Sequence, residues 1–201
     1  IGEASSGGAR APDALYELQE VLELPSVPRT LACFDVSHTQ GSEVVASAVF
    51  FTNGVPDKSE YRRFRIRGEW GNDDFRSLTE ALTRYLRRRL DESRPLPDLL
   101  VIDGGKGQLS AAREALEELD LSQQAVISLA KKDEEIFVPG RGGSIRLPRR
   151  SPALRLLQRA RDEAHRFAIT YNRQRRSMRT VTSELLKIPG VGPTKRRLLL
   201  A

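Results

Sequence analysis

The stretch Leu99-Leu100-Val101-Ile102-Asp103-Gly104-Gly105-Lys106-Gly107-Gln108 defines the centre of the fold. Its apolar start is typical of a short strand that is buried on both faces. The glycine-rich turn that follows leads into an amphipathic segment, Leu109 to Leu119. This β-loop-α unit predicts a parallel strand in an α/β sheet, with Asp103 where the strand leaves the core.

A second apolar strand also closes on an aspartate, Leu31-Ala32-Cys33-Phe34-Asp35. Val44 to Phe51 predicts the next strand, because it is apolar at almost every position. Asn53-Gly54 is a strong signal for a two-residue hairpin turn, so Ser59 to Ile66 is expected to return as an antiparallel third strand. These three strands would form a meander.

The remaining elements follow from helical spacing and turn residues. Helices are predicted over 13–23, 73–91 and from 152 to about 176, with a fifth strand over 125–130 and a hairpin that pairs 135–138 with 144–147. A meander, a helix, a parallel strand, a helix and a further strand make a mixed sheet flanked by helices. That order matches the ribonuclease-H-like fold.

Composition limits the functions that the chain can have. Its net charge is +6, but from Arg149 onward fourteen Lys and Arg oppose three acids, so this part carries +11 and the rest −5. Such a basic block favours a polyanionic partner, and a solvated arginine-rich surface is the alternative. Cys33 is the only cysteine, which excludes disulfides and thiolate zinc sites. No apolar run approaches the ~20 residues of a membrane span, and we expect a cytoplasmic protein.

Asp35, Asp103 and His165 are the candidate catalytic and metal-binding residues. Two strand-end carboxylates can hold Mg²⁺ or Mn²⁺, which activate water and neutralise charge during phosphodiester hydrolysis. His165 lies at the edge of the apolar face of the long helix, where it could ligate the metal or carry a proton. Glu80 could be a fourth ligand, although a surface position is the alternative. A lone aspartate often just starts a turn, and a lone helical histidine often just bonds to a neighbour.

Several further residues are predicted to bind DNA. Lys106 begins a helix, where backbone N–H groups also favour anions, and Arg62 and Arg63 are interleaved with aromatic residues. Residues 185–195 predict a helix, a glycine-rich hairpin and a second helix, a signature of sequence-independent DNA binding. The residues that we assign to DNA binding are Lys106, Arg62, Arg63, Arg173, Arg176, Gly190, Gly192, Lys195 and Arg196. The Gly104 to Gly107 segment lacks the spacing of a nucleotide-binding P-loop.

Taken together, five motifs resemble those of one family: Phe34-Asp35-Val36-Ser37-His38-Thr39-Gln40-Gly41, Tyr61-Arg62-Arg63-Phe64, Asp103-Gly104-Gly105-Lys106-Gly107-Gln108-Leu109, Arg161-Asp162-Glu163-Ala164-His165-Arg166-Phe167-Ala168-Ile169 and Ile188-Pro189-Gly190-Val191-Gly192. From about Ala14 to its end, the chain closely resembles the C-terminal half of the UvrC family, the nuclease subunits of bacterial UvrABC excision repair.

The resemblance implies a metal-dependent ribonuclease-H-like endonuclease that cuts damaged double-stranded DNA on the 5′ side of a lesion, in a complex with UvrB. It places the catalytic triad on Asp35, Asp103 and His165. The expected organisation is a linker remnant over 1–12, the nuclease domain over 13–178 and the start of a truncated helix-hairpin-helix domain over 179–201. The family's GIY-YIG nuclease and UvrB-binding segment are missing, so the chain looks like a fragment. A non-catalytic nucleic-acid-binding module on a degenerate nuclease fold is the alternative.

Overall fold

One mixed sheet forms the centre of the molecule. The computed structural model describes residues 11–38, 44–68 and 73–186, with positions 192, 195 and 198 described singly. Within this part the strands run in the order β3-β2-β1-β5-β6-β7, and β4 also pairs with β2. Their bounds are β1 (Thr30–His38), β2 (Val44–Thr52), β3 (Val55–Pro56), β4 (Arg62–Arg65), β5 (Leu99–Asp103), β6 (Val126–Ala130) and β7 (Glu135–Phe137).

The pairing confirms the predicted ribonuclease-H-like α/β fold. β1 and β2 are antiparallel, whereas β1, β5 and β6 are parallel neighbours, and β7 returns antiparallel to β6. The parallel centre is buried on both faces: Leu31 to Phe34 of β1 and Leu99 to Ile102 of β5 have no exposed surface. This burial explains why both strands consist of uninterrupted apolar residues.

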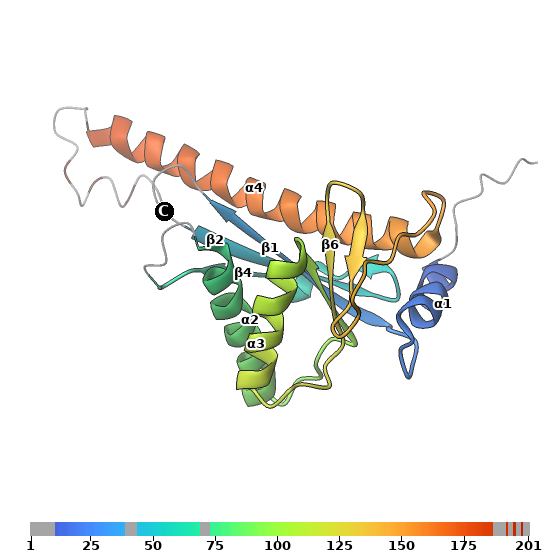
Figure 1. Ribbon diagram of the computed structural model, residues 1–201. Coiled ribbons are helices and arrows are strands. Elements are labelled where there is room, and N and C mark those ends of the chain that lie inside the picture. Colours follow the sequence, from blue (N-terminus) through green and yellow to red (C-terminus); the bar gives the residue numbers. More distant parts are fainter. Residues whose placement is uncertain are drawn as a thin grey trace, which may run out of the picture.

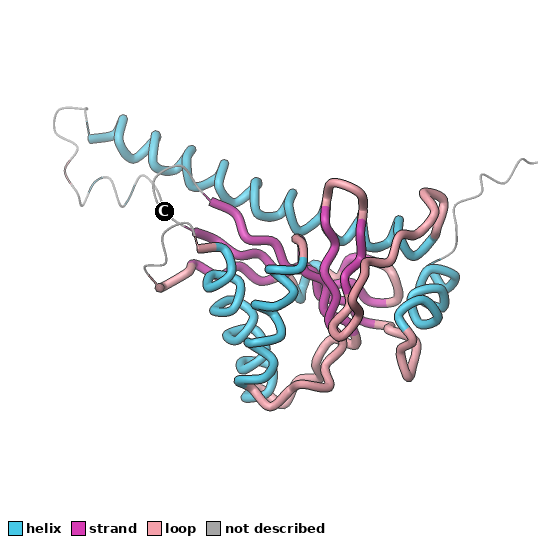
Figure 2. Tube along the Cα trace, in the orientation of Figure 1, coloured by secondary structure: helices cyan, strands magenta, loops and turns pink. Residues whose placement is uncertain are grey.

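Helices cover both faces of the sheet (Figures 1 and 2). α2 (Asp74–Asp91) and α3 (Lys106–Glu118) pack together on one face, and α4 (Pro152–Leu186) crosses the other face over β1 and β2. α1 (Ala11–Leu22) packs against α4. Among the described residues, no helix is both long and apolar enough to cross a membrane.

Several elements differ from their predicted extents. The strand expected over 59–66 is shortened to β4, and the chain between the hairpin turn and β4 forms β3 and a 3-10 turn (Lys58–Glu60). Pro56 has no N–H for the ladder, and the Asp57 side chain accepts from the Ser59 N–H, so the chain turns there. The predicted second hairpin retains one bridge, between Ile136 and Ile145.

The long helix continues ten residues beyond its predicted end at residue 176, to Leu186. No proline or glycine interrupts the sequence before Pro189, so nothing stops the helix earlier. The boundary that we predicted between residues 178 and 179 therefore falls inside a continuous helix.

Candidate active site

Asp35 and Asp103 meet at the carboxyl edge of the parallel strands. Phe34 of β1 pairs with Ile102 of β5, which places the two aspartates next to each other at the strand ends. Both side chains are almost fully buried, at 7% exposure for Asp35 and 5% for Asp103. Two neighbouring strands thus deliver two carboxylates to one point.

His165 approaches this pair from the helix above. Its Nδ1 lies 3.6 Å from Oδ2 of Asp35, and half of its side chain remains exposed. The structure therefore brings together the three residues predicted as the triad, from β1, β5 and α4. The exposed side of the imidazole leaves the site open to a large substrate.

Two ionised carboxylates side by side in a buried place are electrostatically unfavourable. Burial raises the pKa of Asp35, and the adjacent Asp103 carboxylate raises it further, while His165 and Lys131 act in the opposite direction. Oδ2 of Asp35 is buried and receives no hydrogen bond from the described residues. A buried anionic oxygen without a donor favours either a proton or a cation at this position.

Lys131 is a fourth member of the site that the sequence analysis missed. It follows directly after β6, the parallel neighbour of β5, and its Nζ lies 3.2 Å from Oδ2 of Asp103. The segment Lys131-Lys132-Asp133-Glu134 looks like an ordinary charged turn in the sequence. Its position in the sequence could have predicted its role, because the first polar residue after a buried parallel strand lies at the same edge of the sheet as Asp35 and Asp103.

The turn after Asp103 is held by a short network. Gly104 has φ +150°, and a side chain there would collide with Gln108, whose Cγ lies 2.6 Å from an ideal Cβ. The Gln108 Oε1 accepts from the Gly105 N–H, and the Ser128 hydroxyl donates to the Gly105 carbonyl. These contacts fix the turn that joins Asp103, the last residue of β5, to the start of α3.

The donor set suits a small hard cation. Carboxylate oxygens are the preferred ligands of Mg²⁺ and Mn²⁺, and the unbonded Asp35 oxygen offers one coordination position. As the side chains stand, no three His, Cys, Asp or Glu residues of the described chain surround a single point closely enough to form a complete cage. The residues present therefore fit an open site based on the carboxylate pair. Cys33 is fully buried and its pKa is raised, chiefly by that burial, so its thiol stays protonated.

Sequence similarity to known proteins identifies the family. The UvrC RNase H endonuclease domain matches residues 19–169, a span that contains all four residues of the site. The chain belongs to the UvrC family. UvrABC system protein C of Gemmatimonas aurantiaca is 70% identical over 191 residues, which cover 95% of this chain and 31% of that protein. The Gloeobacter violaceus protein is 50% identical over 198 residues, again 95% and 31%. The chain thus spans about a third of these UvrC relatives.

Solved structures give only distant likenesses. Endonuclease V of Ciona intestinalis, in complex with a DNA that contains an inosine, has 15% identity and a TM-score of 0.42 over 62% of this chain and 57% of that one. Human ENDOV has 16% identity and a TM-score of 0.35, over 63% and 52%. The UvrC assignment therefore rests on the family match and on the identity to the UvrC relatives.

Glu80, the predicted fourth ligand in this UvrC-family site, has a local role. Its two carboxylate oxygens accept from the backbone N–H groups of Arg67 and Gly68, at 2.8 and 3.0 Å, and it pairs with Arg84. These bonds fasten the chain after β4 to the middle of α2. Metal ligation by Glu80 remains a prediction.

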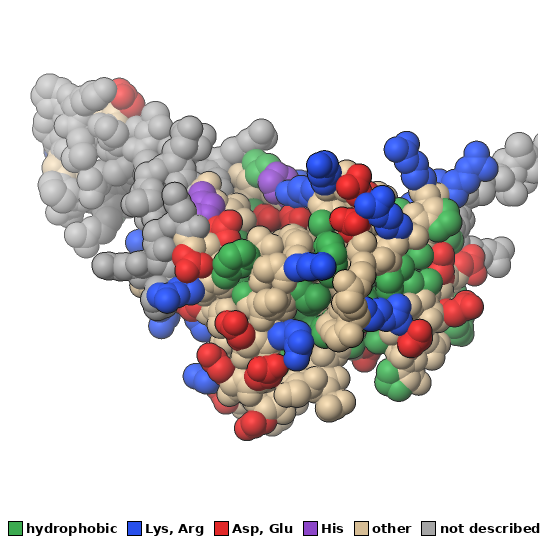
Figure 3. All heavy atoms as spheres, viewed as in Figure 1, with side chains coloured by type: hydrophobic (Ala, Val, Ile, Leu, Met, Phe, Trp, Pro, Cys, Tyr) green, Lys and Arg blue, Asp and Glu red, His purple; other side chains and the backbone are tan. Residues whose placement is uncertain are grey.

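Of the residues predicted to bind DNA, Lys106, Arg62 and Arg63 have described side chains. Lys106 is exposed, and its Nζ lies 5.6 Å from the centre of the Phe137 ring. Arg62 donates to the carbonyls of Ser59 and Tyr61, while Arg63 contacts α4. Figure 3 shows Lys and Arg distributed over the viewed face of the molecule, with acidic side chains between them.

The C-terminal predictions fall largely outside the described residues. The backbone of Arg173 and Arg176 lies within α4, but their side chains are outside the described part. Gly190 and Arg196 lie outside it altogether, and Gly192 and Lys195 are described only as single exposed positions. The helix-hairpin-helix remains a prediction.

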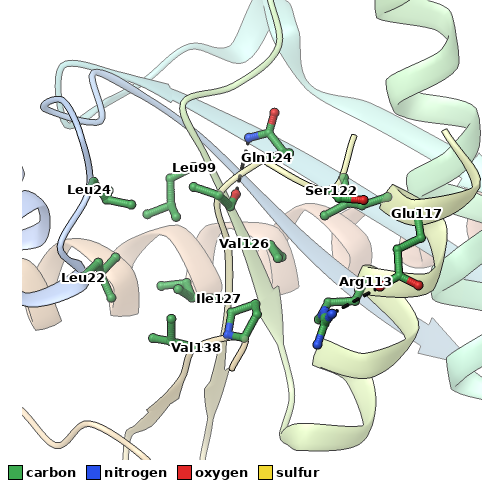
Figure 4. Close-up of a pocket in the computed structure, with 13 residues that line it drawn as sticks. Leu22, Leu24, Leu99, Arg113, Glu117, Ser122, Gln124, Val126, Ile127 and Val138 are labelled. Atoms are coloured by element: carbon green, nitrogen blue, oxygen red, sulfur yellow. Dashed lines mark hydrogen bonds and ion pairs between the residues drawn. The ribbon is translucent and has the colours of Figure 1, made fainter. Parts of the chain in front are cut away.

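Figure 4 shows a pocket whose lining is largely apolar and includes the first residues of β5 and β6. It has a volume of about 190 Å³ and is lined by residues that include Leu22, Leu99 and Val126. Leu99 begins β5, whereas Asp103 ends it. This pocket is therefore separate from the candidate active site.

Proposed function

We propose that this chain is a metal-dependent endonuclease domain that hydrolyses a phosphodiester bond in one strand of damaged double-stranded DNA, on the 5′ side of the lesion. The observation that carries the proposal is the meeting of Asp35, Asp103 and His165, with 3.6 Å between His165 Nδ1 and Asp35 Oδ2. A degenerate, non-catalytic fold would have no reason to keep two buried carboxylates beside an open imidazole, because their burial costs stability.

Each residue has a defined part in this reaction. Asp35 and Asp103 would hold Mg²⁺ or Mn²⁺, which supplies an activated water and neutralises charge on the phosphate. His165 contacts Asp35 through Nδ1, so its other ring nitrogen is free to pass a proton to the leaving oxygen. The Lys131 ammonium lies beside Asp103 and is 62% exposed, which allows it to bond a phosphate oxygen of the strand as well.

The partners follow from the family and from the charge distribution. The relatives are proteins of the UvrABC system, and we extend to this chain a UvrB–DNA complex as the target and the cytoplasm as the location. Lys106 and the basic block from Arg149 onward would neutralise DNA phosphates. The predicted hairpin over residues 185–195 would add sequence-independent contacts.

Incision of a nicked or bubble DNA with Mn²⁺ tests the activity. We expect Asp35→Ala and Asp103→Ala to abolish cutting and His165→Ala to reduce it about 100-fold or more, since general acid–base groups contribute on that order. Full activity in any variant would remove that residue from the site. DNA binding by the wild type without any cutting would favour the non-catalytic module.

The incision position tests the finer claim. A damaged duplex carrying a single lesion and an end label on the damaged strand, with UvrB present, should give one product that ends on the 5′ side of the lesion. Cutting on the 3′ side, or without preference for the damaged strand, would contradict it.

A further inference from the structure

A row of polar side chains runs across the sheet beneath α4. Asp35 of β1 pairs with Ser47 of β2, and Ser47 pairs with Arg63 of β4. Directly opposed residues of neighbouring strands point to the same face of a sheet. The row therefore presents one polar group from each of three strands to the same helix.

Each member of the row contacts the helical turn that carries His165. Asp35 meets His165 itself, and the buried Ser47 hydroxyl donates to the Ala164 carbonyl at 3.0 Å. The Arg63 guanidinium lies 3.7 Å from the centre of the Phe167 ring and donates to the Phe167 carbonyl.

Tyr61, two residues before Arg63, adds a contact on the same turn. Its hydroxyl donates to Oε1 of Glu163 at 2.9 Å, and its ring packs edge-on against Phe167. Glu163 is fixed in turn by Arg166. Ala164, directly before His165, is thus attached to β2, and Phe167, two residues after it, is attached to β4.

We infer that Ser47, Tyr61 and Arg63, here called the α4 anchor, are positioning residues that set His165 against Asp35. The inference rests on the proposed nuclease function, in which His165 belongs to the site. The hydroxyls of Ser47 and Tyr61 each donate to a residue of α4, so both residues act on His165 through this helix.

The turn of α4 that carries His165 needs such an anchor because its buried face is smooth. The buried leucines Leu154, Leu156 and Leu157 lie near the start of α4, whereas the buried residues around His165 are Ala160, Ala164 and Ala168. Small side chains interlock weakly with a sheet, so they leave sliding and rotation of the helix poorly determined. One residue of slippage moves a helix by about 1.5 Å and about 100°, enough to remove the imidazole from Asp35. Directional hydrogen bonds and a stacked guanidinium prevent that.

This inference changes the role of Arg63 from the one predicted from sequence. A residue that binds a DNA phosphate by charge tolerates replacement by lysine, whereas a planar group stacked on Phe167 does not. Arg63→Lys therefore separates the two roles. Arg88→Lys is the matched control, because Arg88 is exposed on α2 and pairs there with Glu92, which lysine can also do.

The position of His165 can be measured without any cutting. The chain has two histidines, His38 and His165, so NMR of the imidazole carbons gives two assignable signals. Mg²⁺ bound by the carboxylate pair should shift the wild-type His165 signal strongly. In Ser47→Ala, Tyr61→Phe and Arg63→Lys, the same Mg²⁺ occupancy should shift this signal less, and the change of the more distant His38 signal serves for comparison.

Incision rates then test the consequence. We expect each anchor variant to cut bubble DNA about 10-fold or more slowly, as small misplacements of catalytic groups do, with its Kd for DNA within about 2-fold of wild type. In a His165→Ala background, Ser47→Ala should change the rate by less than about 2-fold, because the effect passes through His165. Ser77→Ala is the control for loss of a buried hydroxyl, since Ser77 bonds within α2.

The outcomes separate this inference from the proposed function. If Mg²⁺ leaves the wild-type His165 signal unshifted, or His165→Ala cuts normally, the proposed site fails and the anchor fails with it. If His165→Ala is inactive while all three anchor variants show the wild-type shift and rates, only the anchor is overturned. An equal loss from Ser47→Ala with and without His165 would also overturn it.

Discussion

The protonation of Asp35 depends on its burial and on the neighbouring Asp103 carboxylate. Its folded pKa is raised above the ordinary 3.8, first by burial and then by Asp103. The folded chain therefore holds this proton more tightly than the unfolded chain does. Stability from this group is present at acidic pH and is lost as pH rises from 3.8 through the folded pKa. At neutral pH without metal, the pair opposes folding.

Replacement of Asp35 by asparagine should stabilise the metal-free protein. We expect Asp35→Asn to raise the free energy of unfolding at pH 7 by about 1 kcal/mol or more, because a neutral amide removes one of two adjacent buried charges. Urea unfolding at pH 7 and at pH 4 checks this, since the gain should shrink at the lower pH. Asp162→Asn, an exposed position, is the control. A less stable Asp35→Asn at pH 7 would contradict this expectation.

Mn²⁺ should stabilise the wild type against unfolding but should not stabilise Asp35→Asn.

Lys131 should matter for chemistry rather than for DNA affinity. We expect Lys131→Ala to slow single-turnover incision about 10- to 100-fold, because an ammonium is lost beside Asp103 where negative charge gathers. Lys132→Ala, its exposed neighbour, should cut normally. Equal rates for the two variants would remove Lys131 from the site.

Strands and turns match the sequence-based prediction where their own residues determine the conformation. The apolar run of β5 predicted a buried parallel strand, and the apolar run of β1 predicted a strand that also closes on an aspartate. Both aspartates were predicted as metal ligands from these strand-end positions. Asn53 and Gly54 both have positive φ, as the predicted hairpin turn requires. α3 began three residues earlier than expected, because Gln108 caps the helix from inside the glycine-rich turn.

Contacts between distant elements could not be predicted in this way. The spacing of apolar residues placed His165 at the edge of a helical face, but its 3.6 Å approach to Asp35 depends on how α4 crosses the sheet. The α4 anchor carries no local signal, since serine, tyrosine and arginine are ordinary residues in and beside strands. Its role arises only from the register of β1, β2 and β4.

The β5–α3 turn should be intolerant of any side chain at its first glycine. We expect Gly104→Ala to destabilise the protein by about 2 kcal/mol, through the strained φ and the collision with Gln108. Incision should fall as well, because Asp103 precedes this turn. Gly142→Ala is the control, because a Cβ there meets nothing within 4 Å. Equal unfolding midpoints in a urea titration would contradict the prediction.

The molecule as a whole is divided by charge, with +11 from Arg149 onward and −5 before it. Removal of residues 187–201 deletes Lys187, Lys195, Arg196 and Arg197. We expect this to weaken DNA binding at low salt and to reduce the slope of log K against log salt by up to about 4. Fluorescence anisotropy across a salt series measures the slope. An unchanged slope would show that these cations contact no phosphates.

The site is assembled from distant parts of the chain, and this has a consequence for how the protein is made. Ser47 and Ala164, which meet beside it, are 117 positions apart in sequence. Contacts this far apart form late in folding and cannot form before the later segment exists. A chain still emerging from the ribosome would carry both aspartates but lack α4. Under the proposed function, the capacity of this domain to cut DNA would therefore arise only once α4 has been synthesised and has docked on the sheet.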